Sequence, residues 1–220
     1  MKVLVIAPHH DDEILGVGGT IARYVAEGHE VSVCVVTTGS REMYSEDIVI
    51  QTRCETNKSH DFLGIKKSVY LDYPAAMLEE VKRRELNDSL IKLIQEEKPD
   101  EVFIPHRGDM QLDHKLTVDA AMVALRPKYS HRVKRILAYE TLSETGWDVP
   151  NTTNEFIPNV YIDISMYLER KIEAMEFFKT QLSEFPSARS LGAIEALAKY
   201  RGATVNVMAA EAFSLVREIE

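Results

Sequence analysis

Two runs of apolar, mostly β-branched residues limit the fold of this chain more than any other feature: KVLVIA from Lys2 to Ala7 and VSVCVVTT from Val31 to Thr38. A strand that is apolar on both faces is typical of the interior of a parallel sheet, where helices cover both sides. Between the runs, Gly19 to Glu27 is predicted to form a helix that stops at Gly28. Strand, helix and strand then make a βαβ unit with a right-handed crossover.

The alternation of strands and helices continues along the chain and predicts a Rossmann-like three-layer α/β sandwich with a mostly parallel sheet. The expected elements are a helix from Glu46 to Phe62 ending at Gly64, a strand from Ser68 to Leu71, a helix from Glu79 to Glu97, a strand from Glu101 to Ile104, a helix from His114 to Leu125, and strands from Arg135 to Tyr139 and Val160 to Ile164. Helices are then predicted from Met166 to Gln181 and Leu191 to Tyr200, and Ala212 to Glu218 is a last helix or an edge strand. Because no Gly/Ser/Pro-rich or charge-run segment marks a linker, we predict a single domain over residues 1–220.

The composition narrows the classes of partner. A formal net charge of −9 disfavours nucleic-acid and anionic-membrane binding, which require concentrated Lys and Arg. No stretch approaches the roughly 20 apolar residues of a membrane-spanning helix. The apolar run after Lys2 ends at Ala7 and does not have the form of a signal peptide, and the only two cysteines, Cys34 and Cys54, do not indicate a disulfide framework. We therefore expect a cytoplasmic protein with reduced cysteines and a small-molecule substrate.

Two loops that directly follow predicted strands are dense in metal-ligand residue types. The first is PHHDDE from Pro8 to Glu13, and the second is PHRGDMQLDH from Pro105 to His114. In open parallel sheets ligands bind beyond the carboxyl ends of the strands, so both loops are expected at the site. A catalytic zinc typically takes three protein ligands and leaves one position for water, and His9, Asp12 and His114 meet that count. Asp11 is then the free carboxylate that takes a proton from the attacking water.

Each of these residues also has an ordinary structural interpretation. Asp12 and Glu13 could merely cap the helix that follows, and a single loop histidine is more often a surface residue. Two independent His/Asp clusters after two buried strands of one sheet nevertheless favour a metal site.

The segment APHHDDEILGVGGT, from Ala7 to Thr20, resembles the first motif of the LmbE-like or PIG-L family, His-Pro-Asp-Asp-Glu followed by a Gly-Gly helix start. His10 replaces the usual proline. The resemblance covers nearly the whole chain, including Arg201-Gly202 and the AEAF segment from Ala210 to Phe213. It implies a Rossmann-like sandwich and a zinc-dependent hydrolase that removes the N-acetyl group from a conjugate of N-acetylglucosamine (GlcNAc) with inositol, malate or an antibiotic core, or from another acetamido sugar.

Carried over by position, the resemblance implies that His9 and Asp12 are zinc ligands and that Asp11 is the general base. DMQLDH, from Asp109 to His114, is similar to the family's Asp-x-His-x-Asp-His, so His114 is implied as the third ligand and Asp113 as a carboxylate that orients a ligand. In the same way, Arg53 in Arg53-Cys54-Glu55 is implied to hold sugar hydroxyls. The same ligands also accept iron(II).

Gln111 departs from the family pattern, because many members have a histidine at this position. Glutamine cannot deliver a proton, but its amide can donate a hydrogen bond to a developing oxyanion. Acid catalysis would then pass to protonated Asp11, with His106 and His10 as alternatives.

Two rival functions follow from specific residues. The Gly16-Val17-Gly18-Gly19 run after the first strand suggests a dinucleotide-binding oxidoreductase, but the full fingerprint would place its third glycine where Ile21 stands. A non-catalytic sugar-binding paralogue is motivated by Gln111, and a hydrolase of another amide, such as a thiol-conjugate amidase, is an alternative within the enzyme class. The group attached to the sugar is expected to be selected by the segments Ser40 to Ile48 and Ser143 to Asn159, the latter either a rim over the site or an ordinary surface loop. Since members of the family often form trimers or hexamers, the resemblance is also compatible with a homo-oligomer.

Overall fold

The computed structural model describes residues 1–40, 42–128 and 131–220. Within these residues, seven strands form one sheet in the order β3-β2-β1-β4-β5-β7-β6. The strands are β1 (Lys2–Ala7), β2 (Glu30–Thr38), β3 (Lys67–Pro74), β4 (Glu101–Pro105), β5 (Arg135–Tyr139), β6 (Val160–Asp163) and β7 (Ala210–Glu218). Strands β1 to β5 pair in parallel, whereas β7 is antiparallel to both of its neighbours, which gives the mostly parallel sheet that the sequence predicts.

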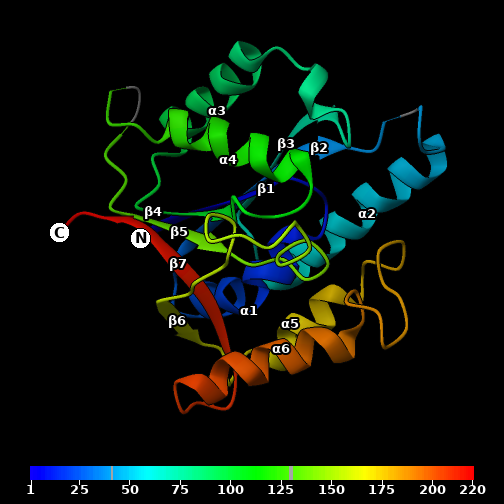
Figure 1. The fold of residues 1–220 in the computed structure, drawn as a ribbon, viewed down its shortest axis with the longest axis vertical. Coiled ribbons are helices and arrows are strands. Elements are labelled where there is room, and N and C mark those ends of the chain that lie inside the picture. The colour runs from blue at the N-terminus through cyan, green and yellow to red at the C-terminus, as the bar shows by residue number, and fades with distance from the viewer. Residues whose placement is uncertain (41, 129–130) are drawn as a thin grey trace.

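Helices cover both faces of this sheet and complete the three-layer sandwich (Figure 1). They are α1 (Asp12–Ala26), α2 (Glu46–Leu63), the 3-10 turn η1 (Leu78–Glu80), α3 (Arg83–Glu97), α4 (Leu112–Ala124), α5 (Leu168–Met175) and α6 (Leu191–Thr204). Helices α3 and α4 lie on one face, and α1, α5 and α6 lie on the other. The predicted fold class is therefore confirmed.

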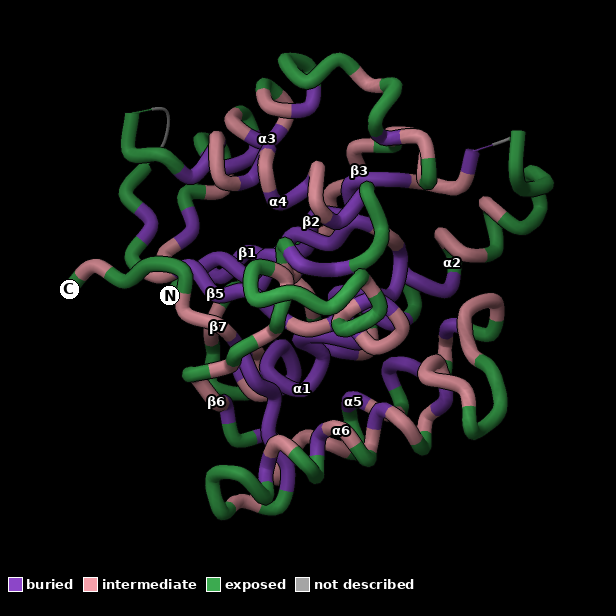
Figure 2. The backbone as a smooth tube through the Cα atoms, in the orientation of Figure 1, coloured by how far each residue is buried: buried purple, intermediate pink, exposed green. Residues whose placement is uncertain are grey.

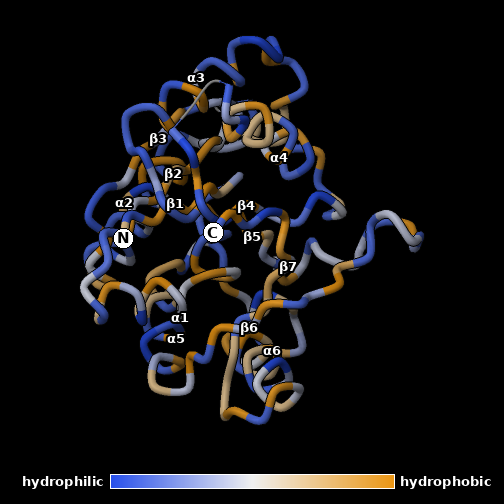
Figure 3. The backbone as a smooth tube through the Cα atoms, turned by 90° about the vertical axis from the view of Figure 1, so that its left-hand side faces the viewer, coloured by the Kyte–Doolittle hydropathy of each residue, from blue (hydrophilic) through white to orange (hydrophobic). Residues whose placement is uncertain are grey.

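The alternation of side chains along β1 explains why its sequence is apolar from Val3 to Ala7. Val3 and Val5 belong to the hydrophobic core on the α1 side, whereas Leu4 and Ile6 belong to the core on the α3 and α4 side. Successive side chains of a strand point to opposite faces, so in a strand covered on both faces the side chains of both sets are buried and mostly apolar. Figure 2 shows the resulting buried centre of the molecule, and Figure 3 shows the hydrophobic residues concentrated on the strands.

Several predicted boundaries are wrong, each for a local reason. The helix predicted from Gly19 begins already at Asp12, because the carbonyl of Asp11 accepts hydrogen bonds from the N–H groups of Ile14 and Leu15, both at 2.9 Å. The helix predicted from Glu79 to Glu97 is divided by extended backbone at Val81 into η1 and α3.

The C-terminal third differs from prediction in two elements. Helix α5 ends at Met175 instead of Gln181, and the following segment turns so that the N–H of Thr180 donates to Glu55 of α2 at 3.1 Å. The segment predicted from Ala212 as a helix or edge strand is strand β7, which lies inside the sheet between β5 and β6. Its neighbours in the sheet come from distant parts of the chain, which local sequence patterns do not encode.

The glycines behind the dinucleotide-binding alternative lie inside α1 and serve helix packing. A Cβ atom on Gly16 would lie 2.2 Å from the ring of Tyr139, and one on Gly19 would lie 2.6 Å from Ile164. These residues therefore let α1 approach the sheet closely and do not form a loop at a helix N-terminus.

The order of the strands fixes where a ligand can bind. The chain moves outward from β1 to β2 and β3, then returns to place β4 on the other side of β1. At such a switch point the loops after the two central strands diverge and leave a crevice at their carboxyl ends. The loops after β1 and β4 are the two metal-ligand-rich segments. Among the described residues, none of the helices is long and apolar enough to cross a membrane.

Candidate metal centre

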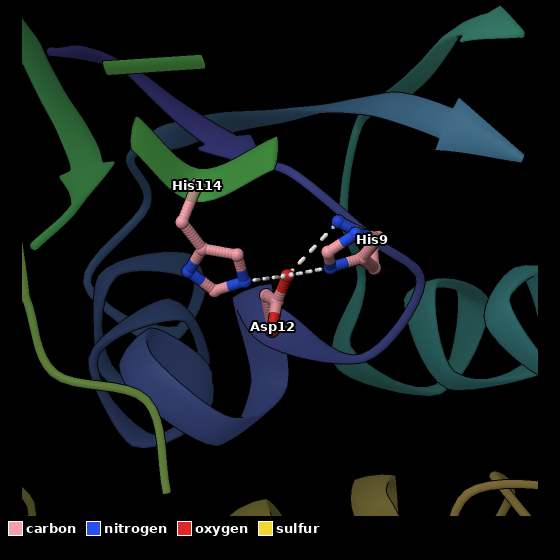
Figure 4. Close-up of side chains that lie close together, drawn as sticks. All are labelled: His9, Asp12 and His114. Atoms are coloured by element: carbon pink, nitrogen blue, oxygen red, sulfur yellow. Dashed lines mark hydrogen bonds and ion pairs between the residues drawn. The ribbon is translucent and has the colours of Figure 1, made fainter. Parts of the chain in front are cut away.

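The crevice between β1 and β4 brings His9, Asp12 and His114 together (Figure 4). His9 lies in the loop after β1, Asp12 is the first residue of α1, and His114 lies in the first turn of α4. One ligand atom from each residue lies within 4.8 Å of the others. Asp12 is central, since its Oδ2 is 3.2 Å from Nδ1 of His9 and 3.3 Å from Nε2 of His114.

Two further carboxylates fix the orientation of the histidine rings. Asp113 Oδ2 lies 3.0 Å from His9 Nε2, and Asp109 Oδ2 lies 2.8 Å from His114 Nδ1. Each ring therefore has one nitrogen on a carboxylate and turns its other nitrogen toward Asp12. Carboxylate-held histidines of this kind are the usual support of a metal ligand, because the outer hydrogen bond selects the tautomer and the ring orientation.

The carboxylates also determine the protonation of the metal-free cluster. Burial would lower the pKa of His9, but its hydrogen bonds to Asp113 and Asp12 outweigh burial and raise it to about 9. Burial acts on His114 in the same way, and Asp12 and Asp109 raise its pKa to about 10. Burial would raise the pKa of Asp12, but the neighbouring His114 and His9 hold it well below its usual value. In the metal-free cluster, His9 and His114 are therefore protonated at neutral pH, and a metal cation would have to displace these protons to bind.

The donor set fits a divalent metal such as zinc. Two imidazole nitrogens and a carboxylate oxygen are a ligand set of catalytic zinc sites. Nε2 of His114 and Oδ1 of Asp12 are buried and have no hydrogen-bond partner among the described residues. Nε2 of His114 makes only the ion-pair contact with Asp12 at 3.3 Å. Buried polar atoms normally have hydrogen-bond partners, so two buried atoms without one at the same cluster indicate that another group satisfies them.

Asp11 is held beside this cluster in an unusual backbone conformation. Its φ is 112°, a region that residues other than glycine rarely adopt, and strain of this kind is found at functional sites. The N–H of Asp11 donates to Glu13 at 3.2 Å, and the Asp11 carboxylate accepts from Arg189 at 2.7 Å. Burial raises the pKa of Asp11 to about 8, while the positive charge of Arg189 opposes the rise.

A cavity of about 670 Å³ opens in front of these residues. Its walls include His9, Asp11, Gln111, Glu144 and Arg189. The volume lies within the ~300–1,000 Å³ range of small-molecule sites. The candidate ligand His9 and the candidate base Asp11 therefore face one space large enough for a substrate, while Asp12 and His114 are buried and do not line it.

The other predicted site residues are placed differently. Arg53 does not line the cavity: it pairs with Asp72, its guanidinium lies 3.7 Å from the centre of the Tyr70 ring, and it reaches Thr38 of the cavity wall at 3.5 Å. His106 is bonded to the carbonyl of Asn154 at 3.0 Å and does not line the cavity either.

His10 does line the cavity. It is buried, with Nδ1 2.7 Å from the hydroxyl of Thr56, and burial lowers its pKa to about 3.

Sequence reasoning missed three residues of the site. Asp109 was part of the quoted motif, and its spacing of five residues before His114 could have indicated its role. Arg189 and Glu144 follow helix α5 and strand β5, and only the fold brings them to Asp11 and the cavity. The segment 143–159 thus contributes to the rim of the site, as one of its two interpretations expected. Residue 41, in the segment Ser40 to Ile48 that is also expected to select the group attached to the sugar, is outside the described residues.

Comparisons with known proteins show which family this chain resembles. The model of the PIG-L family, described as GlcNAc-PI de-N-acetylase, matches residues 4–125, which include both metal-ligand-rich loops. Diacetylchitobiose deacetylase of Thermococcus kodakarensis is 29% identical over 197 residues, which span 84% of this chain and 70% of that protein. A probable N-acetyl-α-D-glucosaminyl L-malate deacetylase of Bacillus anthracis is 26% identical over 192 residues, 82% of this chain and 81% of that protein.

A solved structure extends the similarity to the whole fold. N,N'-diacetylchitobiose deacetylase of Pyrococcus horikoshii, solved with an inhibitor, superposes with a TM-score of 0.79 at 25% identity. The superposition covers 98% of this chain and 83% of that one.

Proposed function

Because this chain belongs to the PIG-L family of de-N-acetylases, we propose that it is a metal-dependent hydrolase that removes the N-acetyl group from a small GlcNAc conjugate. The observation that carries the proposal is the convergence of His9, Asp12 and His114 at the carboxyl ends of β1 and β4, beside the buried carboxylate of Asp11. Similarity to deacetylases of chitobiose and of a malate conjugate supports the acetamido sugar as substrate.

We propose zinc as the metal, held by His9, Asp12 and His114, with iron(II) as the alternative that the same ligands accept. When bound, such a metal supplies a Lewis acid for the acetamide carbonyl and promotes ionisation of water at neutral pH. Asp113 and Asp109 keep the two imidazoles oriented toward it.

Asp11 is the proposed general base and then the general acid. It takes a proton from the attacking water and delivers it to the amine nitrogen as the C–N bond breaks, which releases acetate and the free amino sugar. A pKa raised by burial suits both roles, since the group must gain and lose a proton near neutral pH. Arg189 holds the carboxylate in place by the contact at 2.7 Å.

Two residues are proposed to act on the substrate. Gln111 lines the cavity at the start of α4, and we propose that its amide donates a hydrogen bond to the oxyanion that forms at the carbonyl. The predicted contact of Arg53 with sugar hydroxyls stays a proposal. Arg53 does not line the cavity itself, but its guanidinium donates to the hydroxyl of Thr38, which does.

Metal content and acetate release, measured together on matched variants, test this function. Wild type is expected to hold about one zinc per chain and to release acetate from at least one GlcNAc conjugate. Asp11→Asn should keep the metal and lose turnover, whereas His114→Ala should lose both. Asp119→Asn, on the exposed side of α4, is the control that should change neither.

The outcomes separate the alternatives. Metal retention without acetate release from any acetamido sugar would favour the non-catalytic paralogue that Gln111 motivates. A correctly folded protein that holds no metal, or a fully active Asp11→Asn variant, would refute the proposed mechanism.

A further inference from the structure

One buried carboxyl group of the cavity, that of Glu144, has no role in the proposed mechanism. Glu144 is 7% exposed and lines the cavity together with Asp11, Gln111 and Arg189. Burial raises the pKa of Glu144, and the charges that act on its carboxyl group include those of His114 and Arg189. The carboxyl group therefore lies within electrostatic range of the candidate metal centre and of the guanidinium that holds Asp11.

The turn that carries Glu144 is bonded to the loop before α4. The backbone N–H of Met110 donates to the carbonyl of Glu144 at 3.3 Å. The hydroxyl of Thr145, the next residue of the turn, donates to Oδ1 of Asp109 at 2.6 Å. Oδ2 of the same aspartate lies 2.8 Å from Nδ1 of His114. Glu144 is thereby held in a fixed position relative to the candidate metal centre and the start of α4.

Glu144 differs from the other carboxylates beside the candidate ligands, which each have a basic partner. Asp11, Asp109 and Asp113 are bonded to Arg189, His114 and His9, respectively. Within the described residues, the carboxyl oxygens of Glu144 form neither a hydrogen bond nor an ion pair. Burying a charged group is costly unless the group is paired, so a ligand atom that becomes positively charged suits this position.

Removal of an acetyl group produces positive charge at one atom of the substrate, the nitrogen of the acetamide. The nitrogen becomes positive when Asp11 delivers its proton, and it becomes a neutral amine as the C–N bond breaks. The acetic acid then loses a proton and the amine gains one, so the products are acetate and an ammonium group. Gln111, at the position where the family usually has a histidine, is neutral and brings no charge to this nitrogen.

We propose that Glu144 is a further catalytic residue, whose carboxylate accepts a hydrogen bond from the nitrogen of the scissile acetamide and stabilises the positive charge that forms there. This inference rests on the proposed deacetylase function and adds one group to its site. The bound acetamide is neutral, so the carboxylate acts mainly after substrate binding, when the nitrogen becomes charged. Its effect is therefore expected in kcat more than in KM.

Two glutamates of the segment 143–159 provide matched variants. Glu144→Gln keeps the shape and one acceptor oxygen of the side chain and removes its charge. We expect kcat for acetate release to fall about 10- to 100-fold, with KM changed less than about threefold and metal content unchanged. Glu144→Asp keeps the charge and should retain more of the wild-type kcat than Glu144→Gln. Glu155→Gln is the control and should leave kcat unchanged, because Glu155 is exposed and lines a different cavity, together with Asn151 and Phe156.

Binding of the deacetylated sugar tests the role of the charge without turnover. A glucosamine conjugate carries an ammonium group where the matching glucose conjugate carries a neutral hydroxyl. On metal-loaded protein, calorimetric Kd values should show that Glu144→Gln weakens binding of the glucosamine conjugate about tenfold and binding of the glucose conjugate less than twofold. Glu155→Gln should change neither Kd by more than about twofold.

The outcomes keep this inference separate from the proposed function. If acetate is released and Glu144→Gln has the kcat of wild type, or weakens both conjugates equally, the inference is wrong while the deacetylase stands. Loss of the metal from Glu144→Gln would make Glu144 a support of the metal centre and would also overturn the inference. If wild type releases no acetate, the proposed function fails. The Kd values then still decide whether Glu144 pairs with an ammonium group, and failure of both conjugates to bind would count against it.

Discussion

Replacing Asp113 by asparagine is expected to weaken metal binding although none of the three candidate metal ligands is replaced. Oδ2 of Asp113 lies 3.0 Å from Nε2 of His9 and accepts from the N–H of Ala76 at 2.6 Å, and Oδ1 accepts from the N–H of Leu78 at 3.3 Å. Asparagine keeps one acceptor oxygen but loses the charge and the second acceptor. His9 would then be held less firmly in the orientation that turns Nδ1 toward Asp12.

The magnitude follows from these contacts. Loss of a carboxylate that supports a metal-ligating histidine typically costs 10- to 100-fold in metal affinity, or about 1.4–2.7 kcal/mol. The two backbone hydrogen bonds are charge-assisted, so the metal-free protein should also lose about 1–3 kcal/mol of unfolding free energy. The pKa of His9, which Asp113 helps to raise to about 9, should fall toward its usual value.

Competition with a zinc chelator measures the affinity, urea unfolding measures the stability, and NMR titration of the imidazole follows His9. Asp119→Asn is the control: Asp119 lies on the same helix and forms an exposed ion pair with Arg107, so metal affinity should be unchanged. A zinc affinity within twofold of wild type in Asp113→Asn, or an equal loss in Asp119→Asn, would refute the role assigned to Asp113.

Three further predictions concern residues that the structure places near the site. Gly16→Ala should destabilise the protein by about 1–3 kcal/mol in urea unfolding, because the added methyl group overlaps the buried ring of Tyr139. Gly192→Ala is the control, because its methyl group makes only an ordinary van der Waals contact and should not destabilise the protein. Equal stability of the two variants would contradict this prediction. The folded-state pKa of His10 is lowered to about 3, so the stability contribution of neutral His10 is present above pH 6.5 and is lost as pH falls toward 3. The raised pKa values of His9 and His114 change the stability only above pH 6.5. From pH 6.5 to 5 the metal-free wild type should therefore lose up to ~2 kcal/mol more unfolding free energy than His10→Phe, and parallel profiles would disprove it. Gln111→Ala should lower kcat at least about tenfold with little change in KM if its amide contacts the oxyanion; an unchanged kcat in steady-state acetate release would exclude that contact.

The two metal-ligand-rich loops could be assigned from sequence because each follows a run of consecutive apolar residues, Val3 to Ala7 and Val102 to Ile104. Such runs are buried strands of a parallel sheet, and a loop after such a strand lies at the sheet's carboxyl edge. Residues Arg135–Tyr139 were predicted with the bounds that the structure has, since β-branched and aromatic residues there stand between polar segments. The spacing of His9 and Asp12 also follows locally, because both belong to one turn between β1 and α1.

Element ends and late-chain residues needed tertiary information. Helix α1 begins earlier than predicted, directly after Asp11, which has a positive φ. The N–H of Asp11 donates to Glu13, and its carboxylate is paired with Arg189, which lies 178 residues away in the sequence. Strand β7 is an interior strand because β5 and β6 pair with it from either side. No local pattern distinguishes these outcomes from an ordinary helix start or an edge strand.

The sequence by itself determined the class of fold, the two candidate site loops and the residue types of the candidate ligands, because apolar periodicity and residue chemistry are local properties. The tertiary structure decided which nitrogen of each histidine faces Asp12, because Asp113 and Asp109 hold the others, and it decided that Arg189 pairs with Asp11 while Arg53 is paired with Asp72. Orientation and pairing depend on distances between residues far apart in the chain. Such distances exist only once the sheet has formed and the loops at its carboxyl edge have met.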